Sequence, residues 1–136
     1  MEERINDKIK EVEELLSDLE DIRTDNLDEY IKDIKTRAAC ERYFEKVIEA
    51  VIDLSFLIIK QRELRILEGD EGALRVLANK GIIDETLFSR LSNAKGMRSF
   101  IIHQYEKIDN ELVFEVLNGE LQRDVGEFLD AVRGMR

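Results

Sequence analysis

The sequence predicts an all-α protein, an up-and-down helical bundle built around one long central helix. The chain has no Pro, and 38% of its residues are charged while 43% are hydrophobic, a mixture that favours helices. Apolar residues recur at steps of three and four, and strict alternation is not sustained anywhere, so no sheet is expected. A length of 136 residues predicts a single domain over residues 1–136.

The first helix is predicted from an apolar stripe with helical spacing. The stripe consists of Ile5, Ile9, Val12, Leu16 and Leu19. Residues 24–26 (Thr-Asp-Asn) interrupt it and supply a new N-cap, so a short helix is expected over about 27–35.

The longest helix is predicted over about residues 36–67. Its stripe consists of Cys40, Phe44, Val47, Val51, Leu54 and Ile58. The segment 47–59 is so apolar that we expect it to be buried on more than one side. Cys40 lies on this stripe, so we interpret it as a core residue and not as a nucleophile.

The second half of the chain is divided by turn signals. Residues 68–72 are expected to form a polar loop, followed by a short helix over 73–78 that ends near Gly81. Asp84 is the predicted N-cap of the next helix, which continues to a break at 108–110. A last helix is expected over about 111–132.

The formal net charge of −10 is concentrated at the N-terminus. Residues 1–29 contain 12 acids and 4 bases. This acidity disfavours loose nucleic-acid binding, and DNA is not expected as a partner. The chain has no apolar run of the roughly 20 residues that a membrane helix needs, and its acidic start does not resemble a targeting signal. We therefore expect a cytoplasmic protein without a membrane partner.

One long window, residues 86–104, has no acid but contains Arg90, Lys95 and Arg98. In a chain this rich in charge the window is compatible with chance, or it marks a site for an anion such as phosphate. The same stretch contains the only histidine, His103, with Tyr105 two residues later.

These residues are the only local group suited to catalysis. A guanidinium grips phosphate well, and an imidazole is a general acid or base near neutral pH. Arg98 and His103 alone could therefore cleave RNA by activating a 2′-hydroxyl, without a metal. In the simpler interpretation, His103 is a structural hydrogen-bonding residue, Arg98 a surface ion-pair residue and Tyr105 an interface aromatic. No phosphate loop or metal motif is present, so we expect no cofactor and no metal.

On a regular helix, Arg98 and His103 do not point in the same direction. Arg98 and Tyr105 are seven residues apart and share a face, whereas His103 points about 140° away from Arg98. Either the helix distorts or ends near His103, or the site is shared between two chains.

The pattern Arg98-x4-His103-x-Tyr105 resembles the RX4HXY motif of the HepT-like toxins, which belong to the HEPN superfamily of helical ribonucleases. The resemblance extends over most of the chain. Segments 35–53, 81–84 and 91–98 resemble the family's long helix and the lead-in to its motif, and 105–109 resembles the exit from it.

The resemblance implies a HEPN-type homodimer in which paired motifs face a shared cleft and cleave RNA. It implies Arg98 and His103 as the catalytic pair. We expect Ser99, which follows the motif arginine, to support the site, and Lys95 and Arg90 in the window without acids to help bind phosphate. The partner would be an MntA-like minimal nucleotidyltransferase, the antitoxin of a type VII toxin–antitoxin system, which silences the toxin by transferring AMP to Tyr105. Ser99 departs from the family pattern, in which Asn or another polar residue commonly follows the motif arginine.

A second class of function remains compatible with the same residues. The chain could be a non-catalytic helical dimer that binds nucleotide or a nucleotidyltransferase, with the Arg and His holding a phosphate without breaking it. A structural bundle with no site is a third interpretation. A small nucleotidyltransferase encoded beside this chain would favour either of the first two over the third.

Overall fold

The fold is entirely helical in the part of the chain described by the computed structural model, residues 2–66, 69–103 and 107–135, which confirms the predicted class. In chain order the elements are α1 (Glu2–Ile22), α2 (Leu27–Lys32), α3 (Ile34–Gln61), α4 (Gly69–Asn79), α5 (Glu85–His103), α6 (Asn110–Glu115), the π-helical stretch η2 (Val116–Glu120) and α7 (Leu121–Gly134). Within those ranges no helix is long and apolar enough to span a membrane.

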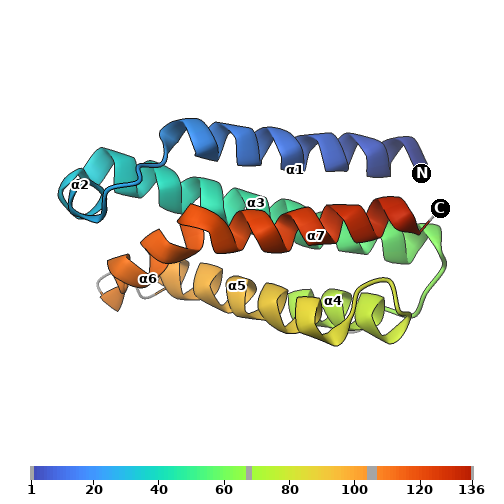
Figure 1. Cartoon of the computed structure of the whole chain (residues 1–136). Coiled ribbons are helices and arrows are strands. Elements are labelled where there is room, and N and C mark those ends of the chain that lie inside the picture. The colour runs from blue at the N-terminus through green and yellow to red at the C-terminus, as the bar shows by residue number, and fades with distance from the viewer. Residues whose placement is uncertain (1, 67–68, 104–106, 136) are drawn as a thin grey trace.

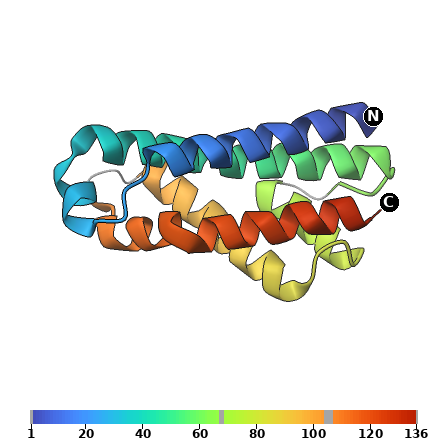
Figure 2. The same cartoon turned by 45° about the horizontal axis from the view of Figure 1, so that its top comes forward.

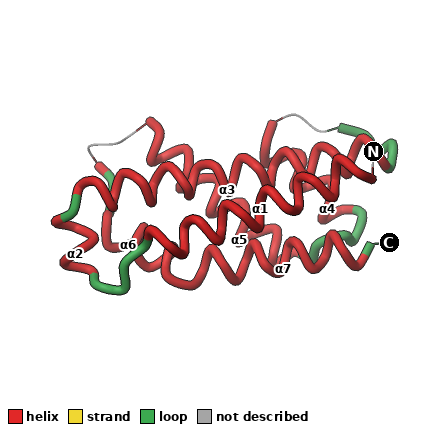
Figure 3. Tube along the Cα trace, turned by 90° about the horizontal axis from the view of Figure 1, so that it is seen from above, coloured by secondary structure: helices red, strands yellow, loops and turns green. Residues whose placement is uncertain are grey.

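The long helix α3 is the centre of the bundle. It packs against α1 and against both α4 and α5, while α7 packs on α5 (Figure 1). Successive long helices alternate in direction, so the two ends of the chain lie at the same end of the bundle (Figure 2). The short helices α2 and α6 lie together at the other end (Figure 3).

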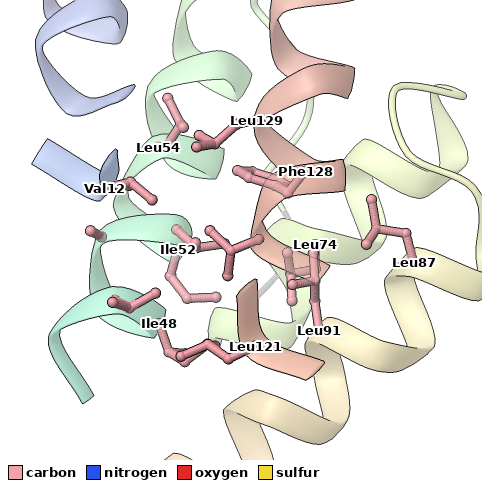
Figure 4. Close-up of a cluster of buried hydrophobic side chains, with 14 of the residues drawn as sticks. Val12, Ile48, Ile52, Leu54, Leu74, Leu87, Leu91, Leu121, Phe128 and Leu129 are labelled. Carbon is pink, nitrogen blue, oxygen red and sulfur yellow. The ribbon is translucent and has the colours of Figure 1, made fainter. Parts of the chain in front are cut away.

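The centre of the core lies where the apolar faces of α1, α4, α5 and α7 meet α3 (Figure 4). Val12 of α1, Leu54 of α3 and Phe128 of α7 are each fully excluded from solvent. Burying a side chain of this size contributes about 1.5–3 kcal/mol, so this contact between helices distant in sequence holds the bundle together. Cys40 is also fully buried, as predicted, and burial raises the pKa of its thiol to about 11.

The corner between α2 and α3 differs from the expected continuous helix over 27–35. Asp33 has extended backbone angles (φ −90°, ψ 96°) and ends α2 at Lys32. Its carboxylate accepts hydrogen bonds from the Lys35 and Thr36 amides, at 3.1 and 3.3 Å, and so caps α3. The long helix therefore begins at Ile34, two residues before the predicted start.

The predicted end of α3 and the loop after it were wrong. The helix ends at Gln61, and not near Leu67, because the chain turns at Glu63, which has a left-handed φ of 52°. The turn contains no Gly or Pro, so no local signal marked it. Residues 69–72, which we expected to be loop, form the first turn of α4.

The turn into α5 matches the sequence prediction. Gly81 has a φ of 73°, a conformation that favours glycine, and Ile82 N–H donates to Leu77 O at 3.0 Å in a helix-ending bond. Asp84 then accepts a 2.7 Å hydrogen bond from the Leu87 amide and caps α5. This cap fixes where the helix with the motif residues starts.

The last predicted helix, 111–132, is interrupted in the structure by η2. Asn118 (φ −108°, ψ 31°) and Gly119 (φ 154°) leave helical geometry. Side-chain amides donate hydrogen bonds to main-chain carbonyls at this interruption. Asn118 donates to Phe114 O at 2.8 Å, and Gln122 donates to Leu117 O at 2.7 Å. Arg23, at the end of α1, also donates to the Asn118 side-chain oxygen. The Asn-Gly pair is a turn signal that the periodicity concealed.

Candidate functional site

Helix α5 holds every described residue of the predicted site in its C-terminal half. Arg98, Ser99 and Lys95 are half-buried, and His103 is exposed at the last position of the helix. Tyr105 lies outside the described residues. The described part of α5 reaches His103, so both solutions that the geometry of the motif allowed remain predictions.

Three of the predicted site residues lie in a row along α5, and Arg98 lies to one side of that row. Lys95, Ser99 and His103 are spaced four residues apart, so they follow one edge of α5. Arg98 follows Lys95 by three residues and lies nearer to the side of α5 that carries the buried Leu91. Arg98 and His103 remain about 140° apart around the helix, with Lys95 and Ser99 between them.

A second stripe on α5 is exposed and carries no formal charge. We name it the outer stripe, and it consists of Ser89, Asn93, Gly96, Phe100 and His103. These residues follow at intervals of four and three, and Phe100 leaves 43% of its surface in solvent. An uncharged strip with an exposed aromatic is unusual on a helix facing water.

A groove lies beside the outer stripe. Its volume is about 570 Å³, and it runs between α5 and the α6–η2 segment. The α5 wall includes Gly96, Met97 and Phe100, and the opposite wall includes Leu112 and Val116. Sequence reasoning missed this groove because its second wall comes from the α6–η2 segment, whose packing beside α5 no local pattern reveals.

Residues 86–104 contain no acid in sequence, but in the folded protein carboxylates of α7 lie close to Arg90. The Arg90 guanidinium lies 3.4 Å from Glu127 and 3.8 Å from Asp124, both on α7. Arg90 is therefore engaged by α7, and the bases of α5 nearer to His103 are Lys95 and Arg98.

A buried carboxyl on α3 also escaped the sequence analysis. Glu41 is only 4% exposed, although its chain position gives no sign of burial. Burial raises the pKa of Glu41, and Glu45 raises it further, while the Arg37 charge acts in the opposite direction. For metals, the described residues contain no group of three or more His, Cys, Asp or Glu that could hold an ion.

Comparisons with known proteins identify the family. The sequence profile described as "Ribonuclease HepT-like" matches residues 5–132, almost the whole chain. The chain belongs to the HepT-like ribonuclease family. This confirms the resemblance seen in the motif.

Relatives of this HepT-like chain with related sequences bear nuclease names. It is 36% identical over 66 residues to a "Putative RNase" of Archaeoglobus fulgidus, covering 48% of this chain and 49% of that protein. It is 26% identical over 89 residues to the "mRNA nuclease HepT" of Shewanella oneidensis, covering 65% and 66%. It is 22% identical over 119 residues to the "tRNA nuclease HepT" of Aphanizomenon flos-aquae, covering 88% and 81%. The chain thus spans about half to two thirds of the first two relatives.

Solved structures share the fold of the HepT-like chain. A tri-AMPylated HEPN toxin of Shewanella oneidensis, in complex with its MNT antitoxin, superposes with a TM-score of 0.88 at 22% identity, covering 96% of each chain. The cytosolic protein YutE of Bacillus subtilis, of unknown function, gives 0.81 at 16% identity, covering 98% and 89%. The predicted HEPN-type bundle is therefore confirmed, whereas the roles of the motif residues stay predictions.

Proposed function

We propose that this chain is a metal-independent endoribonuclease and the toxin of a type VII toxin–antitoxin pair. Membership in the HepT-like family supports a nuclease, and the mRNA and tRNA nucleases among its relatives support RNA as the substrate. The observation that carries the proposal is the end of α5. There His103 is exposed, and the half-buried Arg98 precedes it on a segment without acids.

The chemistry follows from the two side chains. The His103 imidazole removes the proton of a ribose 2′-hydroxyl, whose oxygen attacks the adjacent phosphorus. The bond from phosphorus to the 5′-oxygen breaks, and an imidazolium returns a proton to that oxygen. The products are a 2′,3′-cyclic phosphate and a 5′-hydroxyl. The Arg98 guanidinium stabilises the phosphoryl oxygens while their negative charge grows.

A homodimer completes this site. One α5 directs Arg98 and His103 in different directions, so two copies supply an acid, a base and two guanidiniums to one cleft. The outer stripe supports this arrangement, because apart from His103 it contains no ionisable side chain that a two-fold axis would bring against its own copy. Lys95 and Ser99 lie in the same row as His103 and bind the flanking phosphates.

The activity is tested by RNA cleavage in EDTA with protein whose intact mass shows no AMP. Arg98→Ala and His103→Ala are each expected to lose about 10²–10⁴-fold in rate. Lys80→Ala removes a cation from the exposed turn after α4 and should cleave like wild type. If unmodified wild type cleaves none of several RNA types, the non-catalytic dimer module replaces the proposed nuclease.

The dimer is tested by one substitution made at two positions. Gly96→Glu places a charge in the outer stripe, where a Cβ meets no atom within 4 Å, so the monomer should fold. Gly126→Glu makes the same change on α7, also with no atom within 4 Å of the added Cβ. Light scattering after gel filtration should show a monomer for the first variant and a dimer for the second. A dimeric Gly96→Glu protein would exclude the outer stripe as the interface.

Silencing is proposed to act on Tyr105. The phenol oxygen attacks the α-phosphorus of ATP, pyrophosphate leaves, and the AMP added beside the site repels RNA and blocks it sterically. The test incubates the toxin with ATP and the nucleotidyltransferase encoded beside it. Wild type should gain the mass of one AMP and lose cleavage, while Tyr105→Phe should gain no mass. Mass gain by the Phe variant would place the modification elsewhere.

A further inference from the structure

The groove between α5 and the α6–η2 segment lies beside the end of α5 that carries His103 (Figures 1 and 2). Its volume of about 570 Å³ is within the range of sites for small molecules. Phe100 lines the groove and precedes His103 by three residues, so the two side chains are neighbours on the helix surface. A ligand held at His103 can therefore reach into the groove.

The walls of the groove are mainly apolar. Met97 and Phe100 belong to the α5 wall, and Leu112 and Val116 belong to the opposite wall. Phe100 is 43% exposed and Leu112 is 46% exposed, so both walls present a large apolar side chain to solvent. Gly96 also lines the groove, and a Cβ added there meets no atom within 4 Å. A flat apolar group can therefore approach the α5 backbone at this position.

The charges around the groove are mainly negative. Asp109 and Glu120 are exposed carboxylates in its lining, and Lys107 is the one cation among its described lining residues. Glu111 and Glu115 are two further exposed carboxylates on α6. Carboxylates repel phosphate, whereas they accept hydrogen bonds from the N–H groups of a neutral ligand. The groove is therefore suited to an uncharged, flat ligand with N–H donors, and not to a phosphate.

Two arginines line a smaller cavity that continues the groove toward α7. This cavity has a volume of about 110 Å³ and shares Met97 and Glu120 with the groove. Arg123 Nε lies 2.9 Å from the Asp124 carboxylate, and Arg90 lies 3.8 Å from the same group. Both guanidiniums are thus partly neutralised, so this end of the groove adds no strong site for a phosphate.

We infer that the groove binds one nucleobase of the RNA substrate, stacked on Phe100. This inference rests on the proposed function, because the ribose that carries the base presents its 2′-hydroxyl to His103. The phosphates of the strand then pass along the edge of α5 that carries Lys95 and Ser99, while the carboxylates of the groove repel them. Stacking on a side chain requires an unpaired base, so the substrate is a single-stranded segment or a loop of RNA.

A side chain of a second copy is the other occupant that an apolar groove beside the outer stripe would fit. A whole helix with its side chains is about 10–12 Å across, so a partner helix would cover the groove and not enter it. Leu112 and Val116 of the opposite wall do not belong to the outer stripe. A substitution on that wall therefore separates the two occupants.

The test combines a substitution with a change in the substrate. Leu112→Trp places a large ring in the groove, and Leu112 is 46% exposed, so folding should be retained. Ile66→Trp is the matched control, since Ile66 is 65% exposed in the turn after α3, at the opposite end of the bundle. The substrates are two RNA oligonucleotides with one mapped cleavage site. One is intact, and the other has an abasic ribose that keeps its 2′-hydroxyl on the 5′ side of the cleaved bond.

Wild type without AMP is expected to cut the abasic RNA about 5–150-fold more slowly than the intact RNA, the range for the loss of one stacked base. Leu112→Trp should cut the intact RNA about as slowly as wild type cuts the abasic RNA, with no further loss on the abasic RNA. Its mass by light scattering should remain that of a dimer. Ile66→Trp should behave like wild type on both RNAs.

Equal rates of wild type on the two RNAs would overturn the inference. So would a Leu112→Trp protein that cuts intact RNA like wild type, or one that loses further rate on the abasic RNA, since the base would then bind elsewhere. A monomeric Leu112→Trp protein would overturn it by assigning the groove to a second copy. If wild type cleaves no RNA at all, the proposed nuclease function fails, and that result is seen before any variant is compared.

Discussion

Helices α1 and α5 both lie on the outside of the bundle, but their outward surfaces differ. α1 buries Ile5, Ile9, Val12 and Leu19 and turns mainly charged residues outward. α5 has buried apolar residues on one side, and the outer stripe on its exposed side carries no formal charge. The charged outward face of α1 is suited to contact with water, whereas the uncharged outer stripe of α5 is suited to contact with another macromolecule. The difference separates the helix that only builds the fold from the helix that we propose does the chemistry.

The largest expected effect comes from comparing two phenylalanines. Phe44 on α3 is fully buried, so Phe44→Ala should lower the free energy of unfolding by about 3–5 kcal/mol. Phe100 of the outer stripe is 43% exposed, so Phe100→Ala should change monomer stability far less and weaken self-association instead. Urea unfolding and sedimentation of both variants at equal concentration would check this. Equal losses of monomer stability would contradict the division between core and outer stripe.

A smaller effect is expected where α5 begins. Asp84→Ala removes the side chain that caps the Leu87 amide and should cost about 0.5–2 kcal/mol in unfolding free energy. Asp84→Asn retains a capping oxygen and should recover most of that loss. Denaturant titrations of the two variants give the comparison, and an equal loss for Asn would show that the charge, and not the cap, matters.

The next effect depends on pH and concerns Glu41. Because burial raises its pKa in the folded state, the ionised form opposes folding at neutral pH. That penalty disappears as the pH falls below the pKa of the unfolded chain, where both states are protonated. Glu41→Gln should therefore stabilise the protein at pH 7, on the order of 1 kcal/mol, and have little effect near pH 4. Thermal unfolding across this range measures it, and a destabilised variant at pH 7 would mean that the ionised carboxylate has a favourable partner.

The sequence was sufficient where local chemistry decides structure. The amphipathic stripe of α1, the cap at Asp84 and the left-handed Gly81 are consequences of a few neighbouring residues, and each was predicted. The turn at Glu63 was not, because it contains no Gly or Pro. The helical start at Gly69 was not, because Gly69 and Gly72 are typical of a loop, whereas α4 packs on α3 and is helical from Gly69.

The candidate site was predictable only in part for the same reason. Placing Lys95, Arg98, Ser99 and His103 on one helix required only spacing, and that is where they lie. Which side of α5 faces outward depends on contacts with α3, α4 and α7, since apolar residues occur around much of its circumference. The α7 carboxylates near Arg90 and the groove wall from η2 come from residues more than 15 positions away in sequence, so no local pattern in α5 could reveal them.

The smallest effect should come from the charged surface of α1. Lys8 Nζ lies 2.7 Å from Glu11 and 3.7 Å from Asp53, which raises the pKa of Lys8, the Glu11 hydrogen bond being the main cause. Both acids are about half exposed, so solvent and salt screen the pairs. Lys8→Met keeps the apolar stem and should cost no more than about 0.5 kcal/mol at low salt, and less at 1 M salt. Urea unfolding at both salt concentrations tests this. A loss of unfolding free energy above 1 kcal/mol that persists at high salt would contradict the comparison, because the outward face of α1 would then contribute to stability by more than solvent-screened ion pairs.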